Sequence, residues 1–189
     1  MLRRCLTVLI AVMMLVTTAS CFSSGGDSHI YITEIVSRNK TLIYDVDGES
    51  SDYIEIYNSG DTDVNLHGWF LTDKENKPKK YSLPDVTVKA GEYLVVFCSG
   101  KDFYDEESGE VHTNFKLDGD GEVISLVSDK GVIISLVQFG EIIADASYGL
   151  TDDLDGEYMW FERGTPNEKN SGTYYPSLDK LPTYQVVSQ

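Results

Sequence analysis

The chain has 189 residues, which by the usual size of domains leaves room for one domain and some additional segments. Hydrophobic residues make up 41%, aromatic residues 11% and charged residues 24%, close to the averages of folded soluble proteins, so disorder throughout and a multi-span membrane protein are excluded. The 15 basic and 31 acidic residues give a net charge of −16. Because affinity for nucleic acid comes largely from Lys and Arg, we expect no nucleic-acid partner.

The first 20 residues have the pattern of a signal peptide. Two arginines precede an uncharged run at 5–16, whose 12 residues are too few for a membrane-spanning helix, which needs roughly 20. Small residues then lead to Cys21, and this ending resembles the lipobox of bacterial lipoproteins, in which a diacylglyceryl group is attached to the cysteine after cleavage. Thr18 departs from the lipobox, where Leu is usual. We predict a lipoprotein signal peptide over 1–20 and lipid attachment at Cys21; an ordinary cleaved signal peptide is the alternative.

Residues 21–29 are rich in Gly and Ser and are predicted to form a short flexible tether. Cleavage before Cys21 would remove two arginines and no acidic residue, so the mature chain would carry 13 basic and 31 acidic residues, a net charge of −18. Cys5 would also be lost and Cys21 would carry lipid, which leaves Cys98 without a disulfide partner in an extracytoplasmic compartment. We expect Cys98 to pack as a small apolar residue.

From residue 30 onward, apolar and polar residues alternate between frequent turn residues, a pattern typical of short β-strands. In the segment 53–57, for example, Ile54 and Ile56 fall on one face and their neighbours on the other. We predict no amphipathic helix of three turns. The predicted strands are 30–36, 53–57, 64–71, 81–83, 86–88, 92–97, 115–117, 123–128, 132–139, 145–148 and 158–162.

Many short antiparallel strands in one domain favour an all-β fold, a β-sandwich, because two sheets can bury their inner faces against each other without helices. Asp-Gly turns at 118–121 and 129–131 are predicted to form tight connections between the later strands. The residues expected in the core are Ile32, Ile54, Ile56, Trp69, Leu71, Leu94, Val96, Ile124 and Leu126.

Several short motifs follow one another in order across most of the mature chain. They are Ile32–Ile35, Asp52–Asn58, Val64–Asp73, Tyr81–Pro84, Lys89–Val96, Phe115–Leu117, Gly121–Leu126, Asp145–Gly149 and Gly164–Asn167. Each motif is weak alone, but the ordered set resembles the lamin tail domain, an immunoglobulin-like β-sandwich found in nuclear lamins and in secreted bacterial proteins.

The resemblance implies an immunoglobulin-like β-sandwich over residues 30–170, followed by a C-terminal tail over 171–189. The family usually serves as an adhesion or positioning domain. Two departures concern loop lengths rather than the fold: an acidic insert at 101–112 and a shortened form of the family's Pro/Gly-rich ending at 164–167. For the tail we expect packing along the sandwich or a frayed terminus, with a segment that binds a partner as the alternative.

Structural roles account for most of the polar and glycine residues in these motifs. Gly68 permits a bend where the indole of Trp69 enters the core, and Gly91 permits a positive φ before the next strand. Four polar residues at strand ends are expected to accept backbone N–H groups rather than to bind a ligand. They are Asp52, Asn58, Asp73 and Asp145.

The sequence has no motif that marks an active site. It lacks a nucleophile elbow, a His-Glu-x-x-His motif, a Cys-x-x-Cys motif and a phosphate-binding loop. Three acidic loops offer oxygen ligands of the kind calcium takes, but none has the spacing of an EF-hand, and we predict no metal site, no cofactor and no catalytic residue. The loops are Asp45/Asp47/Glu49/Asp52, Asp118/Asp120/Glu122 and Asp152/Asp153/Asp155.

Two functions of different classes therefore remain. The resemblance implies a non-catalytic module, held by lipid on Cys21 at the extracytoplasmic face of a bacterial membrane, that contacts protein, glycan or cell-wall material. The alternative is a small surface hydrolase, or an accessory subunit of a secreted hydrolase or nuclease, because the family is often joined to such enzymes in longer proteins. We expect the first, because no catalytic domain is attached here.

Overall fold

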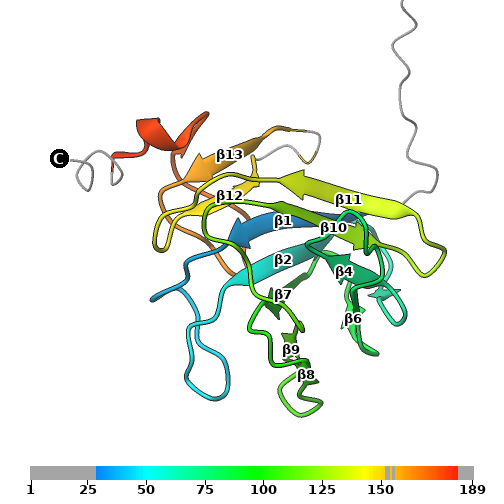
Figure 1. Ribbon diagram of the computed structural model, residues 1–189. Helices are drawn as coiled ribbons and strands as arrows, with labels where there is room; N and C mark the ends of the chain where they lie inside the picture. Colours follow the sequence, from blue (N-terminus) through cyan, green and yellow to red (C-terminus); the bar gives the residue numbers. More distant parts are fainter. Residues whose placement is uncertain (1–28, 152–153, 155, 183–189) are drawn as a thin grey trace, which may run out of the picture.

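The computed structural model describes residues 29–151, 154 and 156–182, and their regular structure is almost entirely β-strand (Figure 1). One short 3-10 helix, η1, covers Leu178–Lys180. The strands are β1 Ile30–Val36, β2 Tyr53–Asn58, β3 Val64–Asn65, β4 Phe70–Thr72, β5 Tyr81–Ser82, β6 Thr87–Val88, β7 Tyr93–Phe97, β8 Phe103–Tyr104, β9 Val111–His112, β10 Val123–Val127, β11 Ile133–Gln138, β12 Ser147–Leu150, β13 Tyr158–Phe161 and β14 Tyr174–Tyr175.

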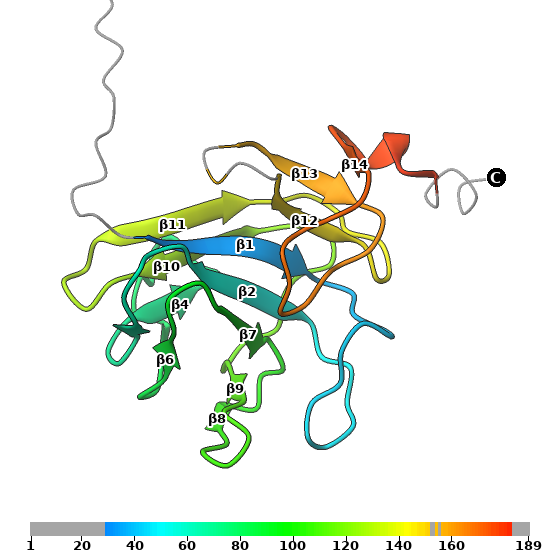
Figure 2. The same ribbon diagram turned by 180° about the vertical axis from the view of Figure 1, so that it is seen from behind.

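Two sheets form the body of the domain. The larger has eight strands in the order β14-β13-β12-β1-β2-β7-β9-β8, the smaller has four in the order β11-β10-β4-β5, and β3 pairs with β6 in a separate ribbon. The four-stranded sheet lies across one face of the larger sheet, as the two opposite views show (Figures 1 and 2). The predicted all-β sandwich is confirmed.

The register of β1 against β2 decides which side chains face the core. Ile35 lies opposite Ile54, and Ile32 lies opposite Ile56. Apolar pairs across adjacent strands stabilise a sheet when one face is buried, so these isoleucines fix the register. The alternate side chains point to the opposite face of the larger sheet, which we call the outer face.

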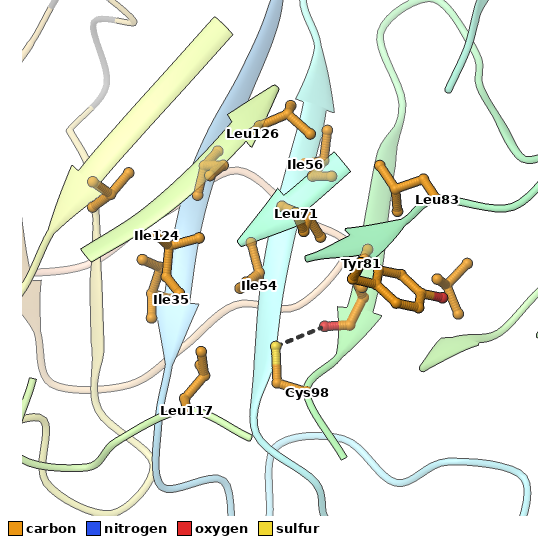
Figure 3. Packing of buried hydrophobic residues seen from close by; sticks show 14 of the residues in the cluster. Ile35, Ile54, Ile56, Leu71, Tyr81, Leu83, Cys98, Leu117, Ile124 and Leu126 are labelled. Carbon is orange, nitrogen blue, oxygen red and sulfur yellow. Dashed lines mark hydrogen bonds between the residues drawn. The ribbon is translucent and has the colours of Figure 1, made fainter. Parts of the chain in front are cut away.

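The core between the sheets is a single cluster of buried apolar side chains contributed by both layers (Figure 3). Of the nine residues predicted for this core, seven are buried, while Trp69 and Leu94 are half-buried at its margin. Cys98 is 1% exposed, free and in contact with the core, and burial raises the pKa of its thiol well above the ordinary value. Its predicted role as a small apolar side chain is confirmed.

The prediction of one strand over 64–71 was wrong, because the chain turns in its middle. Gly68 has a φ of 75°, and the Trp69 N–H donates to the Leu66 carbonyl at 2.9 Å. This turn sends β3 and β4 to different sheets and gives Leu66 the fully buried position that was expected for Trp69. The predicted positive φ at Gly91 is confirmed at 74°.

Three further strand predictions need correction. The segment 115–117 forms only an isolated bridge between Lys116 and Ser99, although Phe115 is buried. The insert 101–112 contains two strands, β8 and β9, and β9 joins the larger sheet parallel to β7. The strand predicted at 145–148 starts two residues later, because Asp145 has a φ of 60° and ends the preceding loop.

Truncating a buried isoleucine should cost far more stability than truncating an exposed leucine of the same sandwich. We expect Ile54→Ala to lower the free energy of unfolding by about 2–5 kcal/mol, because it removes transfer energy and leaves a cavity. Leu136→Ala is the matched control, since Leu136 is 52% exposed and should change it by about 0.5 kcal/mol or less. Chemical denaturation measures both, and equal losses would contradict the assigned core.

Candidate functional site

Two deeply buried carboxyl groups lie on the outer face of the larger sheet. Glu34 and Glu55 are opposite each other in the β1–β2 pair, and both are 0% exposed. A bulge in β1 between Ile32 and Glu34 produces this register. Two carboxyl groups buried side by side would be strongly destabilising unless hydrogen-bond donors surrounded them.

Side-chain hydroxyl groups on β1 and β2 supply some of the hydrogen bonds that these carboxyl groups require. The Tyr53 hydroxyl donates to Glu34 Oε2 at 2.6 Å, and the Thr33 hydroxyl donates to Glu55 Oε1 at 2.8 Å. The donors lie next to the acceptors in the same pair of strands, so this half of the network is local. It leaves further carboxyl oxygens to be satisfied from elsewhere.

The remaining donors come from Gly164–Asn167, which we call the closing segment. The Thr165 N–H donates to both carboxyl oxygens of Glu34 at 3.0 Å, and the Asn167 N–H donates to Glu55 Oε2 at 2.7 Å. A Cβ atom at Gly164 would lie 2.7 Å from the Tyr53 hydroxyl and 2.8 Å from Cδ1 of Leu42, so a larger residue would have to displace these side chains. The resemblance marked this segment as a shortened family ending, but the sequence did not reveal that it covers buried acids.

Burial and mutual repulsion shape the titration of this pair. Burial, followed by the charge of Glu34, raises the pKa of Glu55 to about 8. Burial also raises the pKa of Glu34, against the hydrogen bond from Tyr53, which lowers it. Two adjacent carboxyl groups are the pattern of a glycoside hydrolase. Both are sealed beneath the closing segment, however, so the pair is a structural element and not a catalytic dyad.

Stability should fall as the pH rises from about 4.3 to about 8, because folded Glu55 holds its proton up to about pH 8 whereas the unfolded residue loses it near its ordinary pKa of about 4.3. We expect the free energy of unfolding to drop by on the order of 1–4 kcal/mol between pH 5 and pH 9. In Glu55→Gln, the amide can donate to the Thr33 oxygen and still accept from Asn167, so the dependence should flatten.

Thermal melts across this pH range test the expectation, with Glu75→Gln as the control because Glu75 is exposed. The control should keep the slope of the wild type. A wild-type melting temperature that stays level or rises from pH 5 to pH 9 would show that the pair is fully ionised.

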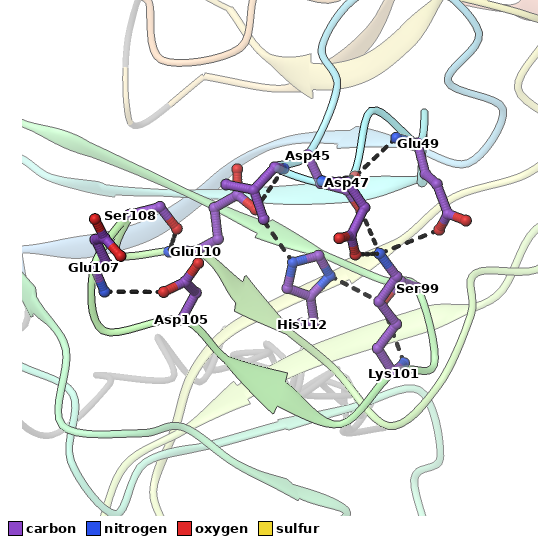
Figure 4. A network of polar contacts seen from close by, with 11 residues as sticks. Asp45, Asp47, Glu49, Ser99, Lys101, Asp105, Glu107, Ser108, Glu110 and His112 are labelled. Atoms are coloured by element: carbon purple, nitrogen blue, oxygen red, sulfur yellow. Dashed lines mark hydrogen bonds and ion pairs between the residues drawn. The ribbon is translucent and has the colours of Figure 1, made fainter.

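A second polar network occupies one end of the sandwich, where the loop 37–52 meets the hairpin of β8 and β9 in the insert 101–112 (Figure 4). We call this end the acidic pole. The Lys101 Nζ lies 2.7 Å from Asp45 Oδ2, 2.8 Å from Asp47 Oδ2 and 3.1 Å from Glu49 Oε2. The ammonium group therefore stands where a cation would sit among these three acids.

This arrangement explains the first acidic loop singled out in the sequence. Burial acts to raise the pKa of Asp45, but the hydrogen bonds from Lys101 and from the Glu49 N–H, together with the charge of Lys101, outweigh burial and lower the pKa. The fourth acid, Asp52, does not join the cluster and instead accepts the Asn39 N–H at 3.1 Å. The sequence pattern did not reveal the role of Lys101, which lies 56 positions after Asp45 in the chain.

Of the other two acidic loops, the second lies within the described residues and the acids of the third do not. In the second, Asp118 accepts the N–H of Asp120 at 2.9 Å, and Glu122 accepts the N–H of Asp118 at 2.8 Å, so the acids order a turn. In the third loop, Asp152, Asp153 and Asp155 lie outside the described residues. Over residues 29–151, 154 and 156–182, no group of three His, Cys, Asp or Glu side chains is placed to hold a metal ion.

A serine, a histidine and a glutamate also line up at the acidic pole. Ser99 Oγ lies 3.0 Å from Nδ1 of His112, and Glu110 Oε2 lies 3.4 Å from Nε2. This order is the reverse of a hydrolase triad, in which the serine contacts Nε2. His112 is 1% exposed and its ring stacks on Phe97 at 5.1 Å, so the line of residues ties the hairpin to the sheet.

Exposed apolar side chains surround this network. Tyr44 and Val46 project from the loop with 54% and 55% exposure, and Phe103 projects from β8 with 47%. The Val46 N–H donates to Glu110 Oε2 at 3.0 Å, which holds the loop against the hairpin. The acidic pole thus presents three apolar groups among carboxylates, a combination that proteins use at interaction surfaces.

The polar residues expected to cap strand ends mostly do so. Asp145 Oδ1 accepts the N–H groups of Lys40 and Thr41 at 2.7 and 2.9 Å, and Asn58 Oδ1 accepts that of Gly60 at 3.0 Å. With Asp52, three of the four predicted caps are confirmed. Asp73 is the exception, because its carboxylate forms an ion pair with Lys80 at 2.6 Å.

The geometry defines a class of protein: an immunoglobulin-like β-sandwich whose buried polar groups are committed to structure. The model of the family described as Lamin Tail Domain matches residues 24–141, more than half of the chain, and the chain therefore belongs to the lamin tail domain family. Domains of this family are generally non-enzymatic and serve in binding or structure. A comparison with curated proteins gave no match.

The predicted lipid attachment site, Cys21, and the predicted signal peptide lie outside the described residues. Within the part of the chain that the structure describes, no helix is long and apolar enough to cross a membrane. The closing segment and strands β12 to β14 follow the matched range, and β14 extends the larger sheet into the predicted C-terminal tail.

Removing the ammonium group at the acidic pole should destabilise the domain. Lys101→Met keeps the length of the side chain but leaves the Asp45 carboxylate, which is 0% exposed, without its countercharge. We expect the free energy of unfolding to fall by about 1–3 kcal/mol. Lys74→Met is the control, because Lys74 is 55% exposed and lies 3.8 Å from Asp73. Similar effects of the two variants in denaturant titrations would contradict a structural role for Lys101.

Proposed function

We propose that this protein is a non-catalytic binding module, anchored through lipid on Cys21 to the extracytoplasmic face of a bacterial membrane, and that it contacts protein, glycan or cell-wall material there. Membership in a family of binding and structural domains supports the non-catalytic part. The acidic pole is the observation that carries the proposal, because it combines exposed apolar side chains with a rigid polar frame.

The placement of the acidic pole suits a surface held by its amino terminus. Strand β1 begins at Ile30, directly after the predicted tether, and the loop 37–52 follows its other end. The steps between the first and the last of the seven residues of β1 cover about 20 Å at about 3.4 Å per step. The pole therefore lies at the end of β1 away from the tether and would face outward from the membrane.

The chemistry of the acidic pole suits a partner with an apolar centre and basic groups around it. Tyr44, Val46 and Phe103 offer apolar area, while acidic side chains such as Asp47 and Glu49 are 66% and 64% exposed at the rim. Exposed charges at the edge of an interface act on association rate and partner choice more than on affinity. The apolar groups would provide most of the binding free energy.

Charge also argues for a lipid anchor. A mature chain with 13 basic and 31 acidic residues would be repelled by anionic lipid headgroups. Stable retention through acyl groups requires two chains, because a single chain binds only marginally. A diacylglyceryl group on Cys21 would supply both.

Changing Cys21→Ser should release the protein from the membrane or leave an uncleaved precursor. Because the anchor would be lost while the sandwich is untouched, the processed variant should move to the aqueous phase of a detergent extraction. Cys98→Ala is the matched control and should stay in the detergent phase. Processed Cys21→Ser that remains in the membrane fraction would contradict lipid anchoring.

The non-catalytic part has its own test. The purified mature chain should bind isolated cell-wall material or a surface protein and show no turnover of ester, polysaccharide or nucleotide substrates. Turnover that Ser99→Ala abolishes would favour the hydrolase, because Ser99 is the serine paired with His112.

A further inference from the structure

A row of three tyrosines crosses the outer face of the larger sheet at the end opposite the acidic pole. Tyr31 in β1 lies opposite Tyr57 in β2, which lies opposite Tyr93 in β7. The rings of Tyr57 and Tyr93 stack, with centroids 4.4 Å apart and planes inclined by 24°. All three side chains are half-buried, so each keeps part of its surface in contact with solvent.

A hollow of about 200 Å³ lies beside the stacked pair. Burial, followed by the neighbouring Tyr57, raises the pKa of Tyr93 to about 12, so its phenol stays neutral at physiological pH. The residues around the hollow include Thr33, Tyr57, Tyr93, Leu150, Lys169 and Asn170. Aromatic and aliphatic walls with polar groups at the edge are typical of small-ligand sites.

Asn170, three residues after the closing segment, fixes one wall of the hollow. Asn170 is 6% exposed, and its amide donates to the carbonyls of Thr33 at 2.8 Å and Leu150 at 2.9 Å. A Cβ atom at Gly149 would lie 2.5 Å from the Asn170 amide nitrogen, so the wall fits closely against β12. The cavity is therefore largely preformed, which lowers the entropic cost of binding.

We propose that this hollow binds one sugar unit of a neutral glycan. A pyranose ring has an apolar face of C–H groups, which can lie on a tyrosine ring, and hydroxyl groups at its edge, which can exchange hydrogen bonds with the tyrosine hydroxyls. The volume is below the roughly 300 Å³ of sites for drug-sized ligands and suits a single ring.

The charges of the surroundings favour a neutral sugar over an acidic one. The chain as a whole is strongly acidic, with a net charge of −16, and this charge opposes an anionic sugar even though Lys169 lines the hollow. A neutral sugar meets no such repulsion.

The inference rests on the proposed binding-module function and assigns it one ligand class at a site separate from the acidic pole. The test titrates the mature chain with cellotetraose, xylotetraose, mannotetraose and N-acetylated chitotetraose, with trigalacturonate as the anionic probe. At least one neutral probe should shift the ring resonances of Tyr57 and Tyr93 and bind with a Kd below about 1 mM.

Substitutions at the two stacked tyrosines test whether the sugar binds in the hollow. Tyr57→Ala and Tyr93→Ala should each weaken this binding at least about tenfold, while Tyr93→Phe, which keeps the ring, should retain most of it. Tyr174→Ala is the control, because Tyr174 is 48% exposed on β14 and should leave affinity unchanged. Melting temperatures establish that each variant is folded.

Three outcomes would overturn the inference: no shift of either ring with any neutral probe, unchanged affinity in both alanine variants, or equal binding of trigalacturonate. Capture of isolated wall material by a Tyr57→Ala/Tyr93→Ala double variant, combined with no sugar binding by the wild type, would retain the binding-module proposal and reject only this site.

Discussion

The burial of two carboxyl groups on one face of a sheet is the constraint on which the rest of this domain depends. Glu34 and Glu55 cannot stay beneath the surface unless backbone N–H groups reach them, and among the described residues the closing segment supplies those groups. Its position in turn fixes Asn170, which bridges β1 and β12 and forms a wall of the tyrosine hollow. A fold without a disulfide among its described residues thus gains its specificity from polar groups that accept a single arrangement.

The two ends of the outer face carry different kinds of side chain. At the acidic pole, Lys101 pairs with three carboxylates and orders them, while apolar side chains remain exposed around them. Near the start of β1, tyrosines occupy the surface instead. The domain can therefore present two chemically distinct surfaces from one rigid sheet, and both lie on elements whose backbone the core holds in place.

Local pattern predicted much of the fold and little of the polar chemistry. The alternation of apolar and polar residues predicted the bounds of β1 and the burial of Ile54 and Ile56, because a strand with one buried face repeats every two residues. It failed where Gly68 turns the chain, since a turn can move a tryptophan from the core to its margin. The pattern also missed β8 and β9, because strands of two residues are too short to show an alternation of apolar and polar residues. The donors to the buried acids lie 112 and 131 positions away in the chain, beyond any local signal.

That separation has a consequence for the order of folding. The first strand carries an acid whose backbone donor is supplied by Thr165, 131 positions later, so the outer face cannot be completed until the last part of the domain has been synthesised. Contacts between distant residues slow folding, because the loop must close before they form. For the export that the proposed lipid anchor requires, a nascent chain that remains open in this way would stay competent for threading through a channel.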